Sequence, residues 1–365
     1  MPSNQGSRRG TLASIAADLG VSRTTVSNAY NRPDQLSPVL RSKILAAAKA
    51  RGYPGPDPTA RSLRAGRTGT IGVLLTEKLS YAFEDHASVD FLAGLAESSY
   101  GTEDMFTLVP VGSEEHEDSS ALVNKAVVDG FVVYSTAAHD PNLKAVVARG
   151  VPLIVCDQPY DTEWPYVGID DFAAIAPAAQ AVIDAGHRHI GILAKRLIST
   201  RPQGGAVTYE EVETADLHVQ RARIQGALAV FEKAGIAPTS VPIVTRHHND
   251  HQAAVDGARE LLESHPELTA VLCTTDSMAL GVLDYARDRV PSDLSVTGFD
   301  GVEIARTRGL TTVIQPNRAK GAAAGNMLHK LIDARLSGKQ IATPRKILKT
   351  TFSPGTTVAA PPERG

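Results

Sequence analysis

From Thr70 onward the sequence alternates short apolar runs with amphipathic segments of helical period, and this alternation constrains the fold more than any other feature. Such a pattern predicts βαβ units, in which helices join parallel strands. A sheet usually has five or six strands, so the number of apolar runs predicts two doubly wound lobes that meet near Val167–Asp171. A ligand would then bind between the lobes, at the carboxyl ends of the strands. We expect strands near Thr70–Leu75, Phe106–Val111, Gly130–Tyr134, Val151–Cys156, His189–Leu193, Val241–Thr245, Ala270–Cys273, Leu294–Phe299 and Lys346–Phe352.

Charge is divided unevenly between a short N-terminal part and the rest of the chain. Residues 1–69 contain eleven Lys and Arg against three acidic residues, a net charge of +8, which leaves −11 elsewhere in a chain of net charge −3. A basic segment on an acidic body is typical of a protein that meets phosphate at one end. A solvated basic tail is the alternative interpretation of the charge alone.

Length and composition indicate a folded protein of two or three domains, since 365 residues with 42% apolar side chains can bury a large core. The N-terminus has no charged-then-apolar leader, and no run approaches the roughly 18 apolar residues of a membrane span. We therefore expect a cytoplasmic protein with no membrane partner.

Cys156 and Cys273 lie in apolar runs and are expected to be buried thiols rather than a disulfide. No GxGxxG or GxxxxGK pattern occurs, and we expect no cofactor.

Residues 11–58 have the pattern of a helix-turn-helix domain, after a polar tail over 1–10 that we expect to be disordered. Thr11 and Ser22 are suitable caps for two helices, and Gly20 can end the first of them. The second helix would fit the major groove of DNA. An ordinary helical hairpin with polar caps is the alternative. We expect helices near residues 12–19, 23–30 and 38–51, the last with Val39, Ile44, Leu45 and Ala48 buried.

Side chains suited to DNA follow the start and exposed face of the second predicted helix. Arg23, Thr24 and Asn28 are placed to reach base edges. Arginine can read guanine through two hydrogen bonds, and asparagine can read adenine in the same way. Contacts to phosphate position a protein on DNA without reading sequence. For that role we expect Thr11, Leu12, Ser22, Thr25, Ser27, Asn31, Ser37 and Arg41.

Residues 59–68 are predicted to form a linker that contains a short, conditional helix. The segment Thr59–Arg64 lies between Pro58 and Gly66 and is too short to be a stable helix alone. It carries one leucine, Leu63, with arginines such as Arg61 beside it. A leucine that only packs within an interdomain linker is the alternative.

Motifs along almost the whole chain resemble the lactose-repressor (LacI/GalR) family of bacterial transcription regulators. Together they extend from residue 11 to about residue 352. The motifs are Ile15-Ala-x-x-x-Gly20-Val-Ser-x-x-Thr25-Val-Ser-x-x-x-Asn31, Arg51-Gly-Tyr53, Ala60-Arg-Ser-Leu63, Gly69-Thr-Ile-Gly-Val73, Gly186-His-Arg-x-Ile190-Gly, Arg223-x-x-Gly226, Asp276-x-Met-Ala-Leu-Gly281, Val296-Thr-Gly-Phe-Asp300 and Leu310-Thr-Thr-Val-x-Gln315-Pro.

The resemblance implies a repressor that binds a pseudo-palindromic operator as a homodimer, with a tetramer not excluded. It implies that the helix carrying Arg61 and Leu63 folds as a hinge on DNA, and that a pair of leucines wedges into the minor groove. It also implies an α/β effector domain of the periplasmic-binding-protein type behind the all-α headpiece. We expect this domain over 69–358, with an N-lobe of about 69–168 and 313–342 and a C-lobe of about 169–312 and 343–358. Bound to its operator, such a protein would be associated with the nucleoid.

The resemblance also indicates where a small polar effector would bind. Arg223 and Asp300 match family positions that face the cleft, and both can hydrogen-bond hydroxyl or carboxylate groups. Asp157 and Asp276 lie at predicted strand ends near the same cleft, although Asp276 is equally suited to cap a helix. Phe83, with Tyr81 nearby, could stack on a ring or simply pack. Where several family members have an aromatic residue this chain has His251-Gln252, and the stretch 197–216 is a candidate lid.

The histidines of the chain give only weak indications of a metal site or of catalysis. His247, His248 and His251 lack the spacing of a structural zinc site, and His187 and His189 are expected to be structural. No catalytic motif is present, so an enzyme on a doubly wound fold is disfavoured. A free solute-binding protein with an incidental basic head is the remaining alternative, and the absence of a signal peptide argues against it.

Overall fold

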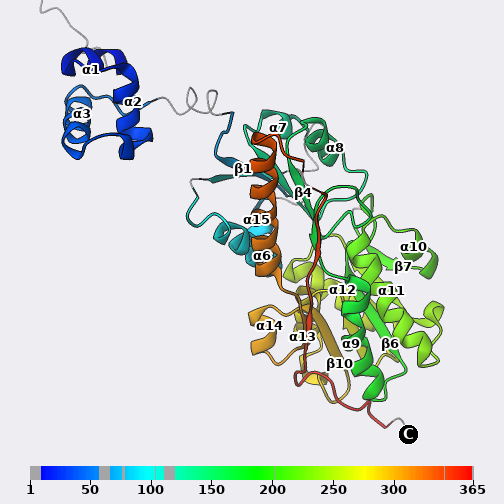
Figure 1. Ribbon diagram of the computed structural model, residues 1–365. Helices are drawn as coiled ribbons and strands as arrows, with labels where there is room; N and C mark the ends of the chain where they lie inside the picture. The colour runs from blue at the N-terminus through cyan, green and yellow to red at the C-terminus, as the bar shows by residue number, and fades with distance from the viewer. Residues whose placement is uncertain are drawn as a thin grey trace, which may run out of the picture. The chain divides into compact units, whose positions relative to one another are not determined.

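The chain forms two compact units, Met1–Thr68 and Gly69–Gly365, in the computed structural model (Figure 1). The structure describes residues 10–56, 66–75, 79–102, 104–110, 120–201, 203–340 and 342–363. The predicted hinge helix, with Arg61 and Leu63, lies outside the described residues, as do residues 1–9 of the predicted tail.

The first unit is a bundle of three short helices, α1 (Leu12–Leu19), α2 (Arg23–Asn31) and α3 (Pro38–Ala50), with a 3-10 turn, η1 (Pro33–Gln35), between the last two. Each helix has the N-cap that the sequence predicts or permits. The hydroxyl oxygens of Thr11, Ser22 and Ser37 accept hydrogen bonds from backbone N–H groups one turn later. Gly20 ends α1 at a φ of +63°, a conformation that favours glycine.

A small apolar core holds this bundle together, formed by Ile15, Ala16, Val26, Ala29, Ile44 and Ala48. Val39 and Leu45 differ from the expectation. The side chain of Val39 is 67% exposed, and Leu45 is half-buried and does not belong to this core. The first turn of α3 presents Leu40, rather than Val39, to the core.

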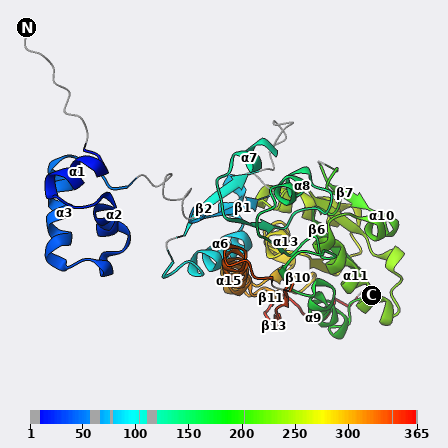
Figure 2. The same cartoon turned by 45° about the horizontal axis from the view of Figure 1, so that its top comes forward.

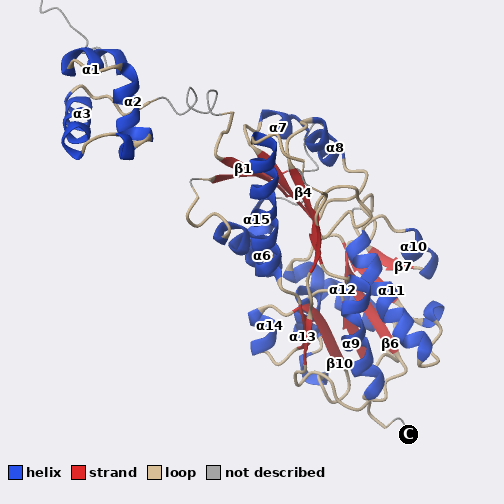
Figure 3. Ribbon diagram, in the orientation of Figure 1, coloured by secondary structure: helices blue, strands red, loops and turns tan. Residues whose placement is uncertain are grey.

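The second unit contains two lobes, each with a central sheet covered by helices on both faces (Figure 3). The N-lobe sheet has the order β12-β5-β4-β3-β1-β2, and its neighbouring strands are parallel. Helices α6 (His86–Glu97) and α15 (Asn317–Leu336) cover one face, whereas α7 (Ser120–Lys125) and α8 (Pro141–Ala148) cover the other. The short α5 (Leu79–Glu84) precedes α6. The strands are β1 (Thr70–Leu75), β2 (Met105–Pro110), β3 (Gly130–Tyr134), β4 (Leu153–Cys156), β5 (Tyr166–Gly168) and β12 (Arg345–Ile347).

The C-lobe sheet has the order β13-β11-β10-β9-β6-β8-β7, with an antiparallel strand at each edge. Helices α9 (Asp171–Asp184) and α11 (His218–Lys233) pack on one face, and α12 (His251–Ser264) and α13 (Asp276–Tyr285) pack on the other. Smaller elements are α10 (Tyr209–Thr214), α14 (Glu303–Thr307), η2 (Pro238–Ser240) and η3 (Arg287–Arg289). The strands are β6 (Ile190–Lys195), β7 (Gly205–Val207), β8 (Ile243–Arg246), β9 (Ala270–Cys273), β10 (Ser295–Asp300), β11 (Thr311–Ile314) and β13 (Thr351–Ser353).

Three crossings of the chain join the lobes, after β5, after β11 and after β12. The expected lobe boundaries near 312 and 343 need correction, because β11 belongs to the C-lobe sheet and β12 to the N-lobe sheet. The late strand expected over 346–352 is in fact two three-residue strands, one in each sheet. Strands of three residues carry no readable periodicity, which is why β5 and β7 were not predicted either. The four-residue β11 was also not predicted.

The helices α6 and α15 approach closely at glycines, and they lie side by side in two views (Figures 1 and 2). A Cβ atom added to Gly321 of α15 would lie 2.0 Å from the backbone oxygen of Phe91 in α6. A Cβ atom at Gly94 of α6 would lie 1.8 Å from the backbone oxygen of Arg318. The packing of these two helices therefore requires residues without a side chain.

Both cysteines are buried and reduced. Within the ranges described above, no helix is both long enough and apolar enough to cross a bilayer.

Candidate functional site

The exposed side of α2 carries the residues predicted to read bases. Arg23 and Thr24 are exposed in the first turn of the helix, and Asn28 lies one turn further and is half-buried. The amide of Asn28 is not free, since its Nδ2 donates a hydrogen bond to Oε1 of Gln35 at 3.1 Å. Gln35, in the turn after α2, was not singled out by the sequence.

Several residues predicted to contact phosphate also hold the bundle together. Besides the three capping hydroxyls, Nδ2 of Asn31 donates to Oγ of Ser27 at 3.1 Å. The Arg41 Nε donates to the backbone oxygen of Ala29 at 3.2 Å, which links α3 to α2. Leu12 packs against the apolar core, and Thr25 lies 2.8 Å from the hydroxyl of Ser22.

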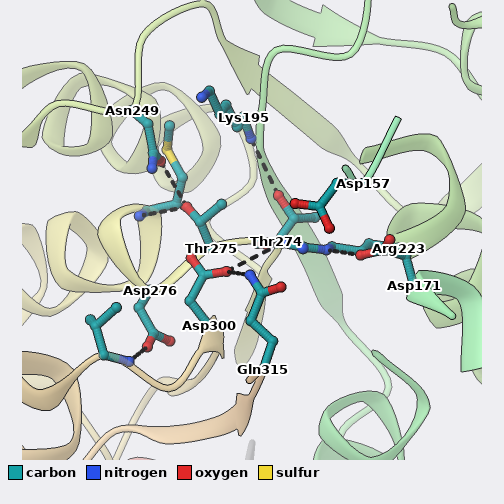
Figure 4. A network of polar contacts seen from close by, with 12 residues as sticks. Asp157, Asp171, Lys195, Arg223, Asn249, Thr274, Thr275, Asp276, Asp300 and Gln315 are labelled. Carbon is teal, nitrogen blue, oxygen red and sulfur yellow. Dashed lines mark hydrogen bonds and ion pairs between the residues drawn. The ribbon is translucent and has the colours of Figure 1, made fainter. Parts of the chain in front are cut away.

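A cavity of about 90 Å³ lies between the two lobes of the second unit. Its lining is polar and comes from both lobes. Asp85, Asp157 and Gln158 contribute from the N-lobe side, and Arg223, Asn249 and Asp300 contribute from the C-lobe side. Figure 4 shows four of these residues, Asp157, Arg223, Asn249 and Asp300. The carboxyl ends of β4 and β10 carry Asp157 and Asp300, which is the position predicted for a ligand in such a fold.

Arg223 and Asp300 lie together in the cleft. Arg223 comes from α11 and is 4% exposed, and its Nε donates to Oδ1 of Asp171 at 2.8 Å. Its NH1 group donates to the backbone oxygen of Thr274 at 2.7 Å and lies 3.5 Å from Oδ1 of Asp300. The guanidinium also lies over the ring of Phe299, at 3.8 Å from the ring centre. Contacts from four residues of the protein thus fix the position of the Arg223 guanidinium.

Asp300 occupies an unusual environment at the end of β10. Its φ of +123° is rare for a residue with a side chain, and such strain is often found at functional sites. Its Oδ1 accepts a hydrogen bond of 2.5 Å from Nε2 of Gln315. Burial raises the pKa of Asp300 to about 8, although the charge of Arg223 opposes this shift.

Asp157 is paired inside the protein. Nζ of Lys320, a residue of α15 that is 1% exposed, donates to both carboxylate oxygens of Asp157 at 2.8 and 2.9 Å. The same ammonium donates to Oε1 of Gln315 at 2.8 Å. A continuous chain of hydrogen bonds therefore runs from Asp157 of the N-lobe through Lys320 and Gln315 to Asp300 of the C-lobe. Lys320 was not predicted, although a lone lysine within the Ala- and Gly-rich stretch of α15 was a possible signal.

Two amide side chains connect the lobes at the cleft. Oε1 of Gln158 accepts a hydrogen bond from the backbone N–H of Val219 at 3.1 Å. Asn249 accepts from the hydroxyl of Thr275 at 2.8 Å, and its Nδ2 donates to Oδ1 of Asp85 across the cleft at 3.3 Å. Neither amide belonged to the predicted site.

Asp276 and Phe83 are not among the residues that line the cavity. Asp276 is fully buried, where its carboxylate accepts hydrogen bonds from the hydroxyl of Thr312 at 2.6 Å and from the backbone N–H of Val302 at 2.8 Å. Burial raises the pKa of Asp276 to about 6. The cap of α13 is Thr275 rather than Asp276. Phe83 is 61% exposed.

The stretch 197–216 forms an edge strand and a short helix in its described residues. Oδ1 of Asp216 accepts from the backbone N–H of Ser199 at 2.9 Å, and Arg201 pairs with Glu211 at 2.7 Å.

His251 and Gln252 begin α12 and are exposed. His187 is buried, within 2.9 Å of the hydroxyl of Thr269 and 2.8 Å of that of Ser295.

Comparison with known proteins agrees with this architecture. The family model for a periplasmic binding protein-like domain matches residues 179–358. The HTH-type transcriptional regulator IpsA of Corynebacterium glutamicum is 54% identical over 357 residues, which are 96% of this chain and 98% of that protein. A crystal structure of a LacI-family transcriptional regulator from the same organism is 49% identical, with a TM-score of 0.73. The match covers 98% of this chain and 100% of that one. The chain belongs to the LacI family of transcriptional regulators.

More distant members of the family share the same fold. A complex of the transcriptional regulator CelR with cellobiose is 26% identical, with a TM-score of 0.68 and coverage of 96% of this chain and 100% of that one. The lac repressor dimer bound to operator and an anti-inducer is 22% identical, with a TM-score of 0.75. The match covers 97% of this chain and 100% of that one. The expected fold, a helical headpiece with a periplasmic-binding-protein-like domain, is confirmed.

Proposed function

We propose that this LacI-family regulator is a repressor that binds a pseudo-palindromic operator as a homodimer and responds to a small polar effector. The observation that carries the proposal is the cavity between the lobes, where Arg223 and Asp300 meet at the carboxyl ends of the strands. Polar groups that converge between two lobes, one of them with a shifted pKa, mark the expected ligand site of such a fold. The proposed work of the protein is regulation, carried out on DNA at the nucleoid.

On the DNA side, the first two turns of α2 supply the base-reading groups. Arg23 would donate two hydrogen bonds to a guanine, Thr24 would contact a neighbouring base, and Asn28 would pair with an adenine. Arg41 and Leu12 would set the position of the headpiece on the phosphates, together with the polar side chains Thr11, Ser22, Thr25, Ser27, Asn31 and Ser37. Thr11, Ser22 and Ser37 would do so in part through the caps that they form.

The dimer brings two headpieces to two half-sites. The lac repressor, which shares this fold, is a dimer on its operator. The N-lobe exposes apolar side chains that a second copy could cover, among them Val89, Met105 and Val127. Between the half-sites, Leu63 and Arg61 of each hinge segment would enter the minor groove and bend the DNA.

On the effector side, the cleft favours an uncharged ligand rich in hydroxyl groups. Its charged side chains already have partners within the protein, Asp157 with Lys320 and Arg223 with Asp171. A charged ligand would have to displace one of these pairs, whereas hydroxyl groups can add hydrogen bonds to them. The related CelR binds cellobiose, which agrees with a sugar or a similar metabolite.

Selection of the purified full-length protein on random duplex DNA at near-physiological salt tests the proposal. The selection is expected to enrich a two-fold symmetric sequence. The affinity of the protein for that sequence should change when a fraction of small polar metabolites is added. Coupling must be reciprocal, so an inducing metabolite must bind the free protein more tightly than the operator complex. Failure to enrich any sequence, with or without metabolites, would contradict the proposed function.

A further inference from the structure

The recognition helix α2 is tied to the turn that follows it by one side-chain contact. Nδ2 of Asn28 donates a hydrogen bond to Oε1 of Gln35, the last residue of η1. The bond joins the face of α2 that carries Arg23 and Thr24 to a residue beyond the end of the helix.

The backbone fixes the position of Gln35. Pro33 begins η1 with a restricted φ, and the backbone N–H of Gln35 donates to the oxygen of Arg32 at 3.0 Å. Leu36 follows at once and packs against the apolar core of the bundle. The turn is therefore anchored next to α2, and it holds the exposed side chain of Gln35 within hydrogen-bond distance of Asn28.

The chemistry of an asparagine amide explains what such an acceptor can do. To read adenine, the amide accepts from the N6 amino group with its oxygen and donates to N7 with the hydrogen on the same side as that oxygen. The second amide hydrogen, on the opposite side, is left over. An acceptor that takes this second hydrogen holds the reading edge toward the DNA. If the Asn28 amide turned over, its oxygen would face the Gln35 oxygen, and the Gln35 amide would have to turn as well to restore the hydrogen bond.

We propose that Gln35 is a positioning residue that orients the Asn28 amide for reading adenine and so sets the preference at one base pair of each half-site. The inference rests on the proposed function, because it takes Asn28 as a base reader. Pre-orienting a side chain lowers the entropy lost when it binds, by an amount that corresponds to about 2- to 10-fold in affinity.

The test uses full-length protein and the duplex enriched by the wild type. The N28A variant first identifies the base pair at which Asn28 discriminates. Affinities of the wild type, Q35A, Q35E, N28A and the N28A/Q35A double variant are then measured for the enriched duplex and for duplexes changed only at that base pair. D34N, on the same turn, is the matched control and should keep the wild-type preference.

Q35A is expected to lose about 2- to 10-fold of discrimination at that base pair and none at the others. Q35E is expected to keep the discrimination, because a carboxylate still accepts from Asn28, while it binds all duplexes more weakly through repulsion of the phosphates. In the N28A background, Q35A should have no further effect on preference.

Two results would overturn the inference. One is full discrimination by Q35A. The other is a change of preference by Q35A when Asn28 is already absent, which would make Gln35 itself a base reader. A wild-type protein that enriches no sequence would instead contradict the proposed function, and the inference would fall with it.

Discussion

Lys320 donates hydrogen bonds to both carboxylate oxygens of Asp157, and the two side chains form an ion pair buried beneath the cleft. Asp157 directly follows β4 of the N-lobe sheet, and Lys320 lies in the helix that follows the second crossing between the lobes. Because Lys320 also reaches Gln315, the pair links the N-lobe to the crossing segment itself. We expect this pair to affect both stability and the relative position of the lobes.

Removal of one partner of this pair should be costly. Lys320→Met would leave a buried carboxylate without its counter-ion and should lower the free energy of unfolding by about 3–5 kcal/mol. The double variant D157N/K320M removes both charges and should recover part of that loss. Urea denaturation of the wild type, K320M, D157N and the double variant measures the coupling. Equal stability of K320M and the wild type would show that the pair carries no net stabilisation.

The stability of the protein should depend on pH through Asp300. Its pKa in the folded protein, about 8, lies above the value of about 3.9 for an exposed aspartate. Between these two values the folded protein retains a proton that the unfolded chain releases, so the stability contribution of this group falls as pH rises. D300N cannot titrate there. As pH rises, the free energy of unfolding of D300N should therefore fall less steeply than that of the wild type. The two slopes should differ by at most about 1.4 kcal/mol per pH unit.

Urea denaturation of both proteins at several pH values from 5 to 8.5 measures this difference. Parallel curves for the wild type and D300N would mean that Asp300 is ionised throughout the range, as an ordinary exposed carboxylate is.

Arg23 and Arg41 should differ in their effect on DNA binding. R23A should lose about 1–3 kcal/mol of discrimination at one base pair in each half-site, because a bidentate contact to guanine is removed. R41A should weaken binding to all duplexes alike and reduce the slope of log affinity against log salt by about one. Affinities over a series of salt concentrations separate the two effects. R41K keeps the charge and serves as the control, and a sequence-dependent effect of R41A would argue against a phosphate contact.

R41A should also affect folding of the headpiece, because the Arg41 side chain donates to the carbonyl oxygen of Ala29 at the end of α2. Loss of this hydrogen bond should cost about 0.5–1.5 kcal/mol. Thermal unfolding followed by circular dichroism would show it as a lower transition temperature of the headpiece, and an unchanged transition would mean that the bond contributes nothing.

The contact between α6 and α15 should tolerate no added methyl group at Gly321. G321A would place a Cβ atom 2.0 Å from the Phe91 carbonyl oxygen, so the two helices must separate. Overpacking of this kind typically costs about 1–3 kcal/mol, against the gain of up to about 1 kcal/mol expected for Gly→Ala in a free helix. N326A, exposed in the same helix, is the control and should be neutral or slightly stabilising. A G321A protein as stable as the wild type would show that the helices can move apart freely.

The local elements of this protein were largely readable from its sequence. Thr11, Ser22 and Gly20 are short-range signals, and each cap that they predicted is present. The mainly apolar segments of β1, β3, β9 and β10 predicted strands because strands that are buried on both faces are rich in apolar residues. Arg223 and Asp300 were placed in the cleft through the family resemblance.

Tertiary structure alone decided the rest. Three-residue strands such as β5 and β12 exist only because a neighbouring strand pairs with them, and such pairing leaves no periodic signal. Lys320 and Gln315 became part of the cleft network because the chain crosses between the lobes beside them. Capping and hydrophobic periodicity depend on residues close in sequence, whereas a buried charge is placed by partners far along the chain. The sequence therefore determined the elements and the family, and the meeting of the two lobes determined which polar side chains share the site.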